Sequence, residues 1–463
     1  MTPVLPKEIR LTAHRLCLIG SMLILILVTS CTKSSTGDLA DLLKTVPSDA
    51  TTVMTVNVHT VLEKSGCKVD ESGKVTLSPA LDNLTKTLGS PVLKENIRAV
   101  IAGDAGVAPT FAVAFTEGDD SFLTFVLDDP DKFISFAESV TGEKAVATGE
   151  IQVCGYMARL ANQGWMRIGN TALIDAGHIA RYSDLTESQS FCSLDIADKF
   201  LKSEKEFLAW ANIDALVSLR GGSFTDRTVA RMAISTIFDD AAIMMTEGKL
   251  SKERFSMESR ILTSKGEDAR CNFSTSKIDV KTLEGFGGAA DMVLAGNISR
   301  QLSRQLRDIM ASQFGGVGEV YAPLLSPLDG TFVAALSRTE GKSDLRMLVT
   351  TDGKSPVSDL MKYLNDSFGT VKRDGKLLKV DNGASSGDIA LDKDSGRLSG
   401  AWLGMMADRD MLTSLTADPT YAAGVAMVVL KVTPDNGGLK ITLDIDTENE
   451  GDALASVLRL MAR

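Results

Sequence analysis

The feature that most constrains the fold is a strand-then-helix pattern that occurs twice. Residues 50–62, Ala-Thr-Thr-Val-Met-Thr-Val-Asn-Val-His-Thr-Val-Leu, give an apolar strand, an asparagine and the start of a helix. Residues 290–302, Ala-Asp-Met-Val-Leu-Ala-Gly-Asn-Ile-Ser-Arg-Gln-Leu, repeat the pattern 240 positions later. In each copy the asparagine, Asn57 or Asn297, could cap the helix by accepting a bond from a free backbone N–H. This self-similarity predicts an internal duplication.

Three more pairs of segments support the duplication because they follow in the same order. Each copy has a hairpin and then a helix: 110–127 with a helix start at Asp129-Pro130, and 331–350 with a helix near 356–364. Residues 165–168 match 402–405, and a last hairpin at 243–262 matches one at 425–445. The alternative is that strand–asparagine–helix patterns are common and that the matches are coincidental.

The final strand alternates apolar and polar residues, as a half-buried antiparallel strand does. Its inward side chains are predicted to be Leu439, Ile441, Leu443 and Ile445, and its outward ones Lys440, Thr442, Asp444 and Asp446.

The sequence therefore predicts an α+β fold of two tandem copies of an antiparallel-sheet unit with strand–helix and hairpin–helix elements. The copies occupy 39–278 and 284–463, with glycines 285–288 in the linker. The first copy holds an insert near 178–230 that looks mostly helical. Within it, 210–216 repeats the strand–asparagine pattern once more.

Residues 1–30 have the pattern of a secretory signal peptide, with basic residues ahead of an apolar run at 16–28. That run is shorter than the ~20 residues that span a membrane. Ser30-Cys31 follows it and resembles the lipobox of bacterial lipoproteins. The resemblance implies cleavage between Ser30 and Cys31 and a lipid on the Cys31 sulfur. The alternatives are an ordinary signal peptide cut near Ser30 and an uncleaved anchor.

Residues 31–38 form a short polar tether that would hold the folded part close to the membrane. No aspartate follows Cys31 directly, which is similar to lipoproteins sorted to the outer membrane. We therefore expect a cell-envelope protein that contacts the membrane through the lipid on Cys31 and faces the periplasm.

The charge balance argues against nucleic acid as a partner. Residues 1–30 hold three basic residues and one acidic residue, so removing them turns 49 basic and 60 acidic residues into 46 and 59. The resulting net charge of −13 opposes binding to nucleic acid, which needs a basic patch.

Few residues suggest catalysis. His59 and His178 are the only histidines after residue 30, too few to favour a Ser-His-Asp triad or a histidine metal site. Ser65-Gly66-Cys67-Lys68 matches the Ser-x-x-Lys of serine acylases, but the companion motifs are missing and Gly66 fits a helix end. Acidic groups at 117–120, 128–131 and 446–450 fit caps and turns better than a calcium site. No catalytic residue, metal site or cofactor is assigned.

Four cysteines follow Cys31, and no two are spaced as Cys-x-x-Cys. We expect buried free thiols, with one disulfide as the alternative, at Cys67, Cys154, Cys192 and Cys271.

Two other residue classes have structural interpretations. Gly315 to Gly318 is predicted to be a loop after a helix ending near Ser312. Trp165, Trp210 and Trp402 lie in strand-like apolar runs, so core positions are favoured over an exposed carbohydrate platform.

The start of the folded part also resembles a known family. Residues 46–53, Val-Pro-Ser-Asp-Ala-Thr-Thr-Val, follow a lipobox and lead into Leu62-Glu-Lys-Ser-Gly66. This pattern is similar to that of a Bacteroidetes-type envelope lipoprotein family whose domain has no assigned function, and the resemblance extends over most of 40–463. It implies an envelope lipoprotein and supplies no catalytic residues.

These observations favour a non-enzymatic binding or assembly module with an envelope protein as partner, held by its lipid. The partner would use a groove between the two copies or an exposed sheet edge. One alternative is a carboxylate-dependent hydrolase, which needs two acids about 5–9 Å apart in a pocket. Another is a carrier of a small ligand or lipid, which needs an enclosed apolar cavity.

Overall fold

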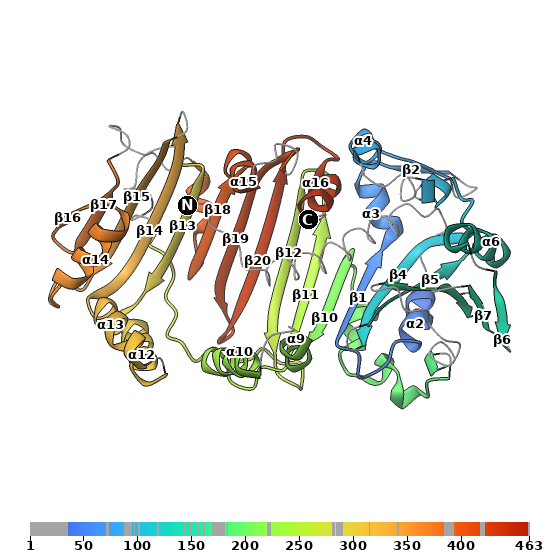
Figure 1. Cartoon of the computed structure of the whole chain (residues 1–463), viewed down its shortest axis with the longest axis horizontal. Helices are drawn as coiled ribbons and strands as arrows, with labels where there is room; N and C mark the ends of the chain where they lie inside the picture. The colour runs from blue at the N-terminus through green and yellow to red at the C-terminus, as the bar shows by residue number, and fades with distance from the viewer. Residues whose placement is uncertain are drawn as a thin grey trace.

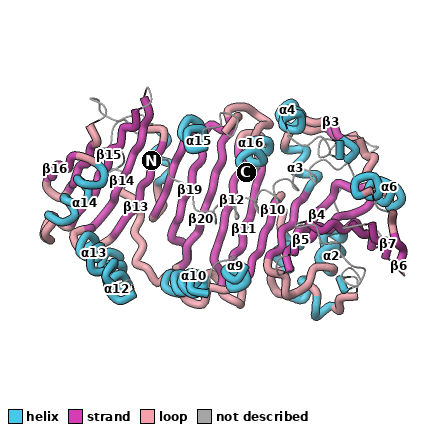
Figure 2. The backbone as a smooth tube through the Cα atoms, in the orientation of Figure 1, coloured by secondary structure: helices cyan, strands magenta, loops and turns pink. Residues whose placement is uncertain are grey.

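One long antiparallel sheet organises the chain (Figures 1 and 2). The structure is a computed structural model that describes residues 36–70, 74–87, 95–96, 98–100, 102–117, 120–142, 144–148, 151–154, 157–160, 163–168, 181–182, 184–219, 224–279, 283, 290–313, 315–339, 342–383, 393–416 and 422–461. Eighteen strands form the sheet, and helices pack against it. The predicted α+β class is confirmed, whereas residues 1–30 and Cys31 lie outside the described residues.

The first half of the sheet contains the strands up to residue 262. They are β1 (Thr52–Asn57), β4 (Val107–Glu117), β5 (Asp120–Leu127), β6 (Val146–Thr148), β7 (Ile151–Cys154), β8 (Met157–Leu160), β9 (Gln163–Ile168), β10 (Phe207–Asn212), β11 (Ile243–Leu250) and β12 (Arg254–Leu262). A separate small sheet pairs β2 (Lys68–Val69) with β3 (Val75–Thr76).

The second half contains the strands from residue 292 onward. They are β13 (Met292–Ile298), β14 (Leu328–Thr339), β15 (Lys342–Thr351), β16 (Thr370–Asp374), β17 (Leu377–Asp381), β18 (Leu403–Asp408), β19 (Val425–Asp435) and β20 (Gly438–Thr447). The last strands of the halves, β12 and β20, pair with each other, so the sheet is continuous from one half to the other.

The pairings run in the same order outward from β12 and from β20. On one side β12 is followed by β11, β10, β1, β4, β5 and β9. On the other side β20 is followed by β19, β18, β13, β14, β15 and β17. If β12 and β20 are each counted as the first strand, the third strand is β10 in the first half and β18 in the second.

This order corrects one sequence match. Residues 165–168 lie in β9, which pairs with β5, whereas 403–405 belong to β18, between β13 and β19. The two segments that contain Trp165 and Trp402 thus hold different places in the sheet, and 207–212 holds the place of 403–408. The insert near 178–230 contains this strand, β10, where the sequence repeats the strand–asparagine pattern, and β10 pairs with β1 and β11.

Helices from both halves of the chain cover much of one side of the sheet. The first half has α3 (Val58–Lys64), α4 (Pro79–Thr87), α6 (Pro130–Thr141), α9 (Ile213–Leu219) and α10 (Phe224–Ile237). The second half has α12 (Arg300–Gln313), α13 (Gly315–Leu325), α14 (Ser358–Phe368), α15 (Arg409–Thr416) and α16 (Ala453–Met461). Among the described residues, no helix has the length and apolar character to cross a membrane.

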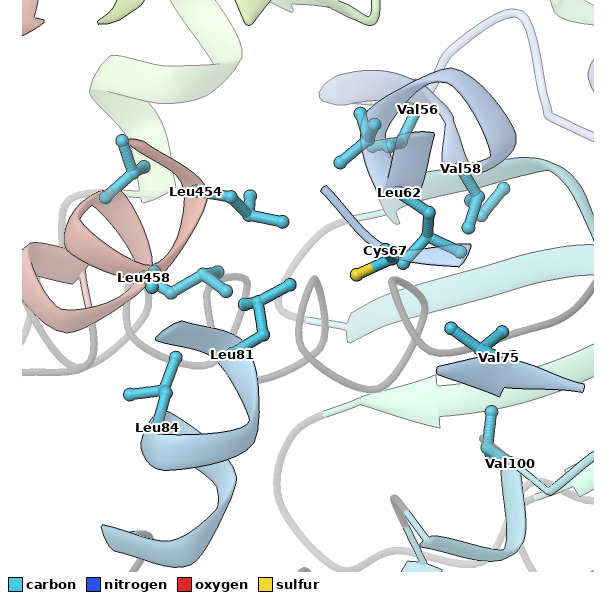
Figure 3. Packing of buried hydrophobic residues seen from close by; sticks show 14 of the residues in the cluster. Val56, Val58, Leu62, Cys67, Val75, Leu81, Leu84, Val100, Leu454 and Leu458 are labelled. Carbon is cyan, nitrogen blue, oxygen red and sulfur yellow. The ribbon is translucent and has the colours of Figure 1, made fainter. Parts of the chain in front are cut away.

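Four buried clusters lie on the two sides of the sheet. On the helix side, α3, α4, α6 and α16 pack on the first half and the central pair, and Leu454 and Leu458 of α16 point toward Leu81 of α4 (Figure 3). At the far end of the same side, α14 packs on β15 and β17. On the reverse side, α2 (Thr36–Lys44) and α8 (Ala197–Lys202) cover the first half. Ile278, Leu283, Leu398 and Ala401 contribute to the cover of the second half there.

Helix starts follow the strands directly, and their caps show which predictions hold. Asn57 Oδ1 accepts from the Thr60 N–H at 3.1 Å, as predicted, and Asp129 caps α6. Asn297 does not cap a helix. Its amide donates to the Lys277 carbonyl at 2.9 Å, because α12 begins later and Ser299 Oγ accepts from the Leu302 N–H instead.

Gly315 to Gly318 is a second correction, because these residues start helix α13 rather than a loop. A Cβ atom on Gly318 would lie 1.8 Å from the Met310 carbonyl oxygen of α12. Gly318 therefore permits the backbones of α12 and α13 to approach closely. Judged by composition alone, the glycines at 315–318 indicate a helix break.

Candidate binding surface

An uncharged surface crosses the middle of the sheet on the helix side. In antiparallel strands, directly paired residues point to the same side. The register therefore aligns one row of Met54, Ala209, Thr246, Ser259, Ile441, Val432 and Leu403. The next row contains Met257, Leu443, Leu430, Met405 and Leu294. We call the apolar members of these rows, together with Met244, the open apolar face.

The open apolar face is partly exposed along its whole length. Leu403 is 37% exposed, and the other members are half-buried. Helices α15 and α16 stand over one end of the central strands, and α9 and α10 lie at the other end (Figure 1). No helix drawn for the described residues crosses the strand middles between them (Figure 1). Ile441, Leu430 and Val432 belong to none of the four buried clusters described above.

The chemistry of this surface is apolar and adaptable. Four of its members, Met54, Met244, Met257 and Met405, are methionines, whose flexible thioether chains fit partners of varied shape. Thr246 and Ser259, the two hydroxyl residues of the same rows, bond to each other at 2.8 Å. The two rows therefore offer a ligand no charged side chain.

The final strand differs in part from its prediction. Leu439 and Ile445 are buried as expected, and Ile445 lies in the cluster that α16 covers. Ile441 and Leu443, also predicted to face inward, are only half-buried. On the opposite side, the acids predicted to face solvent, Asp444 and Asp446, are 19% and 18% exposed.

The reverse side of the central pair carries balanced charges. Arg260 on β12 donates to Asp435 at 2.8 Å and to Asp268 at 3.2 Å. Lys440 on β20 lies 3.6 Å from Glu258. Because each acid has a basic partner, this side is best explained as an ion-pair network between the halves.

A hollow of about 400 Å³ lies beside this network, and its lining includes Glu247 and Glu258, which are paired directly across β11 and β12. Glu258 accepts from Arg260 at 3.0 Å, and Glu247 lies 3.9 Å from Lys205. Both carboxylates are thus engaged with basic side chains. A second hollow, of about 590 Å³, contains Asp129, which already caps α6.

The residues singled out in the sequence do not come together. His59 is half-buried and places Nε2 3.5 Å from Glu63 Oε1, whereas His178, Ser30 and Cys31 lie outside the described residues. Ser65 Oγ is buried and donates to the Val61 carbonyl at 2.6 Å, which occupies the hydroxyl of the Ser-x-x-Lys motif.

The cysteines with described side chains are free thiols. They are Cys67, Cys192 and Cys271, and burial raises the pKa of each thiol. Cys154 ends strand β7, and its side chain lies outside the described residues. Raised thiol pKa values disfavour a reactive thiolate, which is the nucleophilic form.

Sequence reasoning missed a set of exposed aromatic residues. Tyr321 on α13 and Tyr363 on α14 are 42% and 38% exposed, with ring centroids 6.1 Å apart. Phe368 continues the set at 6.3 Å from Tyr363. The tryptophan prediction holds for Trp210, which is buried. Trp402 is half-buried and donates Nε1 to the Asn297 carbonyl at 2.9 Å.

The fold and surface define a class: an α+β protein built on one long antiparallel sheet, with an open apolar face on its helix side. No protein-family model and no curated protein matches the chain. Among solved structures, the chain is similar to TP0453 in its crystal form I, with 10% sequence identity and a TM-score of 0.28. The matched region covers 52% of the present chain and 82% of the TP0453 chain. Crystal form III covers 50% and 82%, at 11% identity and a TM-score of 0.29. Likeness at this level carries no argument about function.

Proposed function

We propose that this protein is an envelope lipoprotein, anchored by lipid on Cys31, that works as a non-enzymatic binding module through its open apolar face. The partner is another envelope protein, and the anchor sits in the outer membrane on the periplasmic side. The anchoring rests on the Ser30-Cys31 sequence and on the resemblance to the Bacteroidetes-type lipoprotein family.

The observation that carries the binding role is the open apolar face. A sheet normally buries its apolar side against another layer. Here that side is covered by α16 over one end of the central strands and by α14 on β15 and β17, and the surface beside them remains half-exposed. Extended apolar surfaces on folded proteins mark interaction sites. Binding at a sheet edge is less favoured, because edge strand β16 exposes Lys372 and Arg373, which discourage added strands.

We propose further that the two halves arose by duplication of one unit. Support comes from the shared order of pairings on either side of β12 and β20. It also comes from matching caps: Asn212 Oδ1 accepts from the Ala215 N–H at 3.0 Å, and Asp408 Oδ1 from the Met411 N–H at 2.9 Å. These residues end β10 and β18, the strands at corresponding places.

A hydrolase is the weaker candidate, because Glu247 and Glu258 are each held by basic side chains. A carrier that encloses a lipid is also weaker, because the apolar surface is an open sheet face rather than a closed cavity.

The anchor is tested by replacing the lipidated cysteine. Cys31→Ser should move folded protein from the membrane fraction to the soluble fraction, whereas Cys192→Ser, which removes a thiol elsewhere, should leave it membrane-bound. Membrane retention of Cys31→Ser would contradict the lipid anchor.

The docking role is tested in the anchored protein by photo-crosslinking in cells. A photo-reactive phenylalanine analogue at position 441 faces the open side, and the same analogue at position 442 faces the reverse side. A reproducible protein adduct from position 441 and none from 442 is the expected result. Equal adducts from both positions, or none from 441, would rule out docking on this face.

A further inference from the structure

We propose that the occupant of the open apolar face is an α-helix with an uncharged stripe, supplied by a partner protein and lying across the strands. The inference rests on the proposed function, since it names the class of partner for the same surface. It follows from three properties: the backbone groups of the central strands are already paired, helices stand on the same face, and the face is rich in methionine.

The first argument concerns backbone hydrogen bonds. Strand β12 pairs with β11 and β20, and β19 pairs with β20 and β18, so the sheet backbone under the face is paired on both sides. The Thr246 and Ser259 hydroxyls also bond to each other. An extended peptide lying on this face would bury its own N–H and C=O groups without partners, at about 1–3 kcal/mol each. A helix satisfies these groups internally, so it avoids this cost.

The second argument concerns the thickness of the layer. Helix α16 places Leu454 and Leu458 in the same cluster as Phe255 and Ile445, which point to the same side as the open face. Helix α15 packs beside it on β18 and β19. These helices form a layer roughly 10 Å deep. A further helix fills that layer to the same depth, whereas the sheet of a second copy, which needs about 10 Å of separation, would meet α15 and α16 first.

The third argument concerns length and adaptability. Eight neighbouring strands lie under the face, in the order β1, β10, β11, β12, β20, β19, β18 and β13. Neighbouring strands are about 4.8 Å apart, so the face is roughly 34 Å long across them. A helix of about 20 residues is about 30 Å long. Methionines Met54, Met257 and Met405 are spread over this distance and can adapt to different apolar side chains. A helix with an apolar stripe therefore fits the face in length and chemistry.

The test uses the full chain carrying Cys31→Ser and two fluorescent peptides of about 20 residues. One peptide has leucines at i, i+3, i+4 and i+7 spacing, and the other has the same composition in scrambled order. We expect the striped peptide to bind at least about tenfold more tightly by fluorescence anisotropy. Ile441→Lys should weaken that binding about tenfold or more, and Thr442→Lys, one residue away on the reverse side, should leave it unchanged.

A second variant guards against unfolding. Met405→Gln keeps the side-chain length but adds a polar amide, and it should weaken the striped peptide while the thermal melting temperature stays near that of the parent. Equal binding of both peptides, or peptide binding that is insensitive to Ile441→Lys and Met405→Gln, would overturn the helix proposal.

Two further readouts separate failure of the helix class from failure of the proposed function. One contrary outcome is binding of palmitate but not of the striped peptide, and another is a dimer of this chain in place of peptide binding. If Ile441→Lys abolishes the palmitate binding or the dimer, the helix proposal is overturned and the open apolar face remains a docking surface. If no peptide, palmitate or self-association depends on Ile441, and position 441 gives no adduct in cells, both proposals fail.

Discussion

Arg254 and Asp446 join the two halves of the sheet, because Arg254 Nε on β12 donates to Asp446 Oδ1 on β20 at 2.5 Å. Arg397 also donates to Asp446, so one carboxylate receives two guanidinium groups. The side chains of Asp446 and Arg397 are 18% and 21% exposed, which shields this pair from solvent more than an ordinary surface ion pair. Asp446 therefore stabilises the junction between the halves.

Asp446→Asn should lower the free energy of unfolding by about 1–2 kcal/mol, because hydrogen bonds to charged groups contribute more than neutral ones. The amide keeps the shape of the side chain but cannot neutralise two guanidinium groups. Urea denaturation followed by circular dichroism measures the loss.

The control for this variant is an exposed pair of the same type. Asp374 pairs with Lys379 at 3.0 Å, and their side chains are 70% and 54% exposed. Asp374→Asn should change stability by less than about 0.5 kcal/mol. If the two variants lose equal stability, the Asp446 ion pairs at the junction contribute no more to stability than an exposed ion pair.

Local sequence patterns were sufficient where a structure depends on near neighbours. Asn57 and Asp129 were identifiable as caps because a cap acts on residues two or three positions away. Asn297 follows an apolar strand as Asn57 does, yet its side-chain amide donates to the carbonyl of Lys277, which is distant in sequence. The sequence pattern cannot distinguish these two outcomes.

The open apolar face required the tertiary structure for a similar reason. Ile441 and Ile445 occupy equivalent positions of one alternating strand. Ile445 is buried because α16 packs over it, whereas Ile441 is half-buried because the helix does not extend that far. Alternation predicts which residues share a side of the sheet, but the extent of a covering helix is set by packing between distant segments.

Gly106 should be intolerant of a side chain. Its φ is +66°, and a Cβ there would lie 2.1 Å from the Asp129 carbonyl oxygen and 2.7 Å from the Phe133 nitrogen. Gly106→Ala should therefore cost about 3 kcal/mol or more, from backbone strain of about 1–2 kcal/mol plus overpacking of about 1–3 kcal/mol. Thermal and urea denaturation both measure this loss.

Gly103 is the matched control, because its φ is +77° and a Cβ there would have no atom within 4 Å. Gly103→Ala should cost only the strain, about 1 kcal/mol. Similar losses for both variants would show that the contact with α6 does not limit Gly106.

Asp352 should make stability depend on pH under acid conditions. Burial alone would raise the pKa of its carboxyl, but hydrogen bonds from Ser355 and Lys354 and the charge of Arg300 lower that pKa from 3.8 to about 2. A lowered folded-state pKa stabilises the protein above the unfolded-state value. This contribution, about 2 kcal/mol, is lost as the pH falls from about 4 to about 2.

The stability difference between the parent protein and Asp352→Asn isolates this effect from other titrating groups. The parent should be more stable at pH 7, and the difference should shrink by about 2 kcal/mol between pH 4 and pH 2. A difference that stays constant over this range would show that Asp352 titrates alike in the folded and unfolded states.

The ion pair between Lys64 and Glu206 should respond asymmetrically to mutation. The Glu206 side chain is 2% exposed and also accepts from the Leu250 N–H at 2.8 Å, whereas the Lys64 side chain is 36% exposed. Lys64→Met leaves a buried carboxylate without its counter-ion and should cost about 3 kcal/mol. Glu206→Gln keeps an acceptor for Leu250 and leaves a lysine that can reach water, so it should cost about 1 kcal/mol. Urea denaturation at pH 7 compares the two, and a larger loss for Glu206→Gln would contradict this asymmetry.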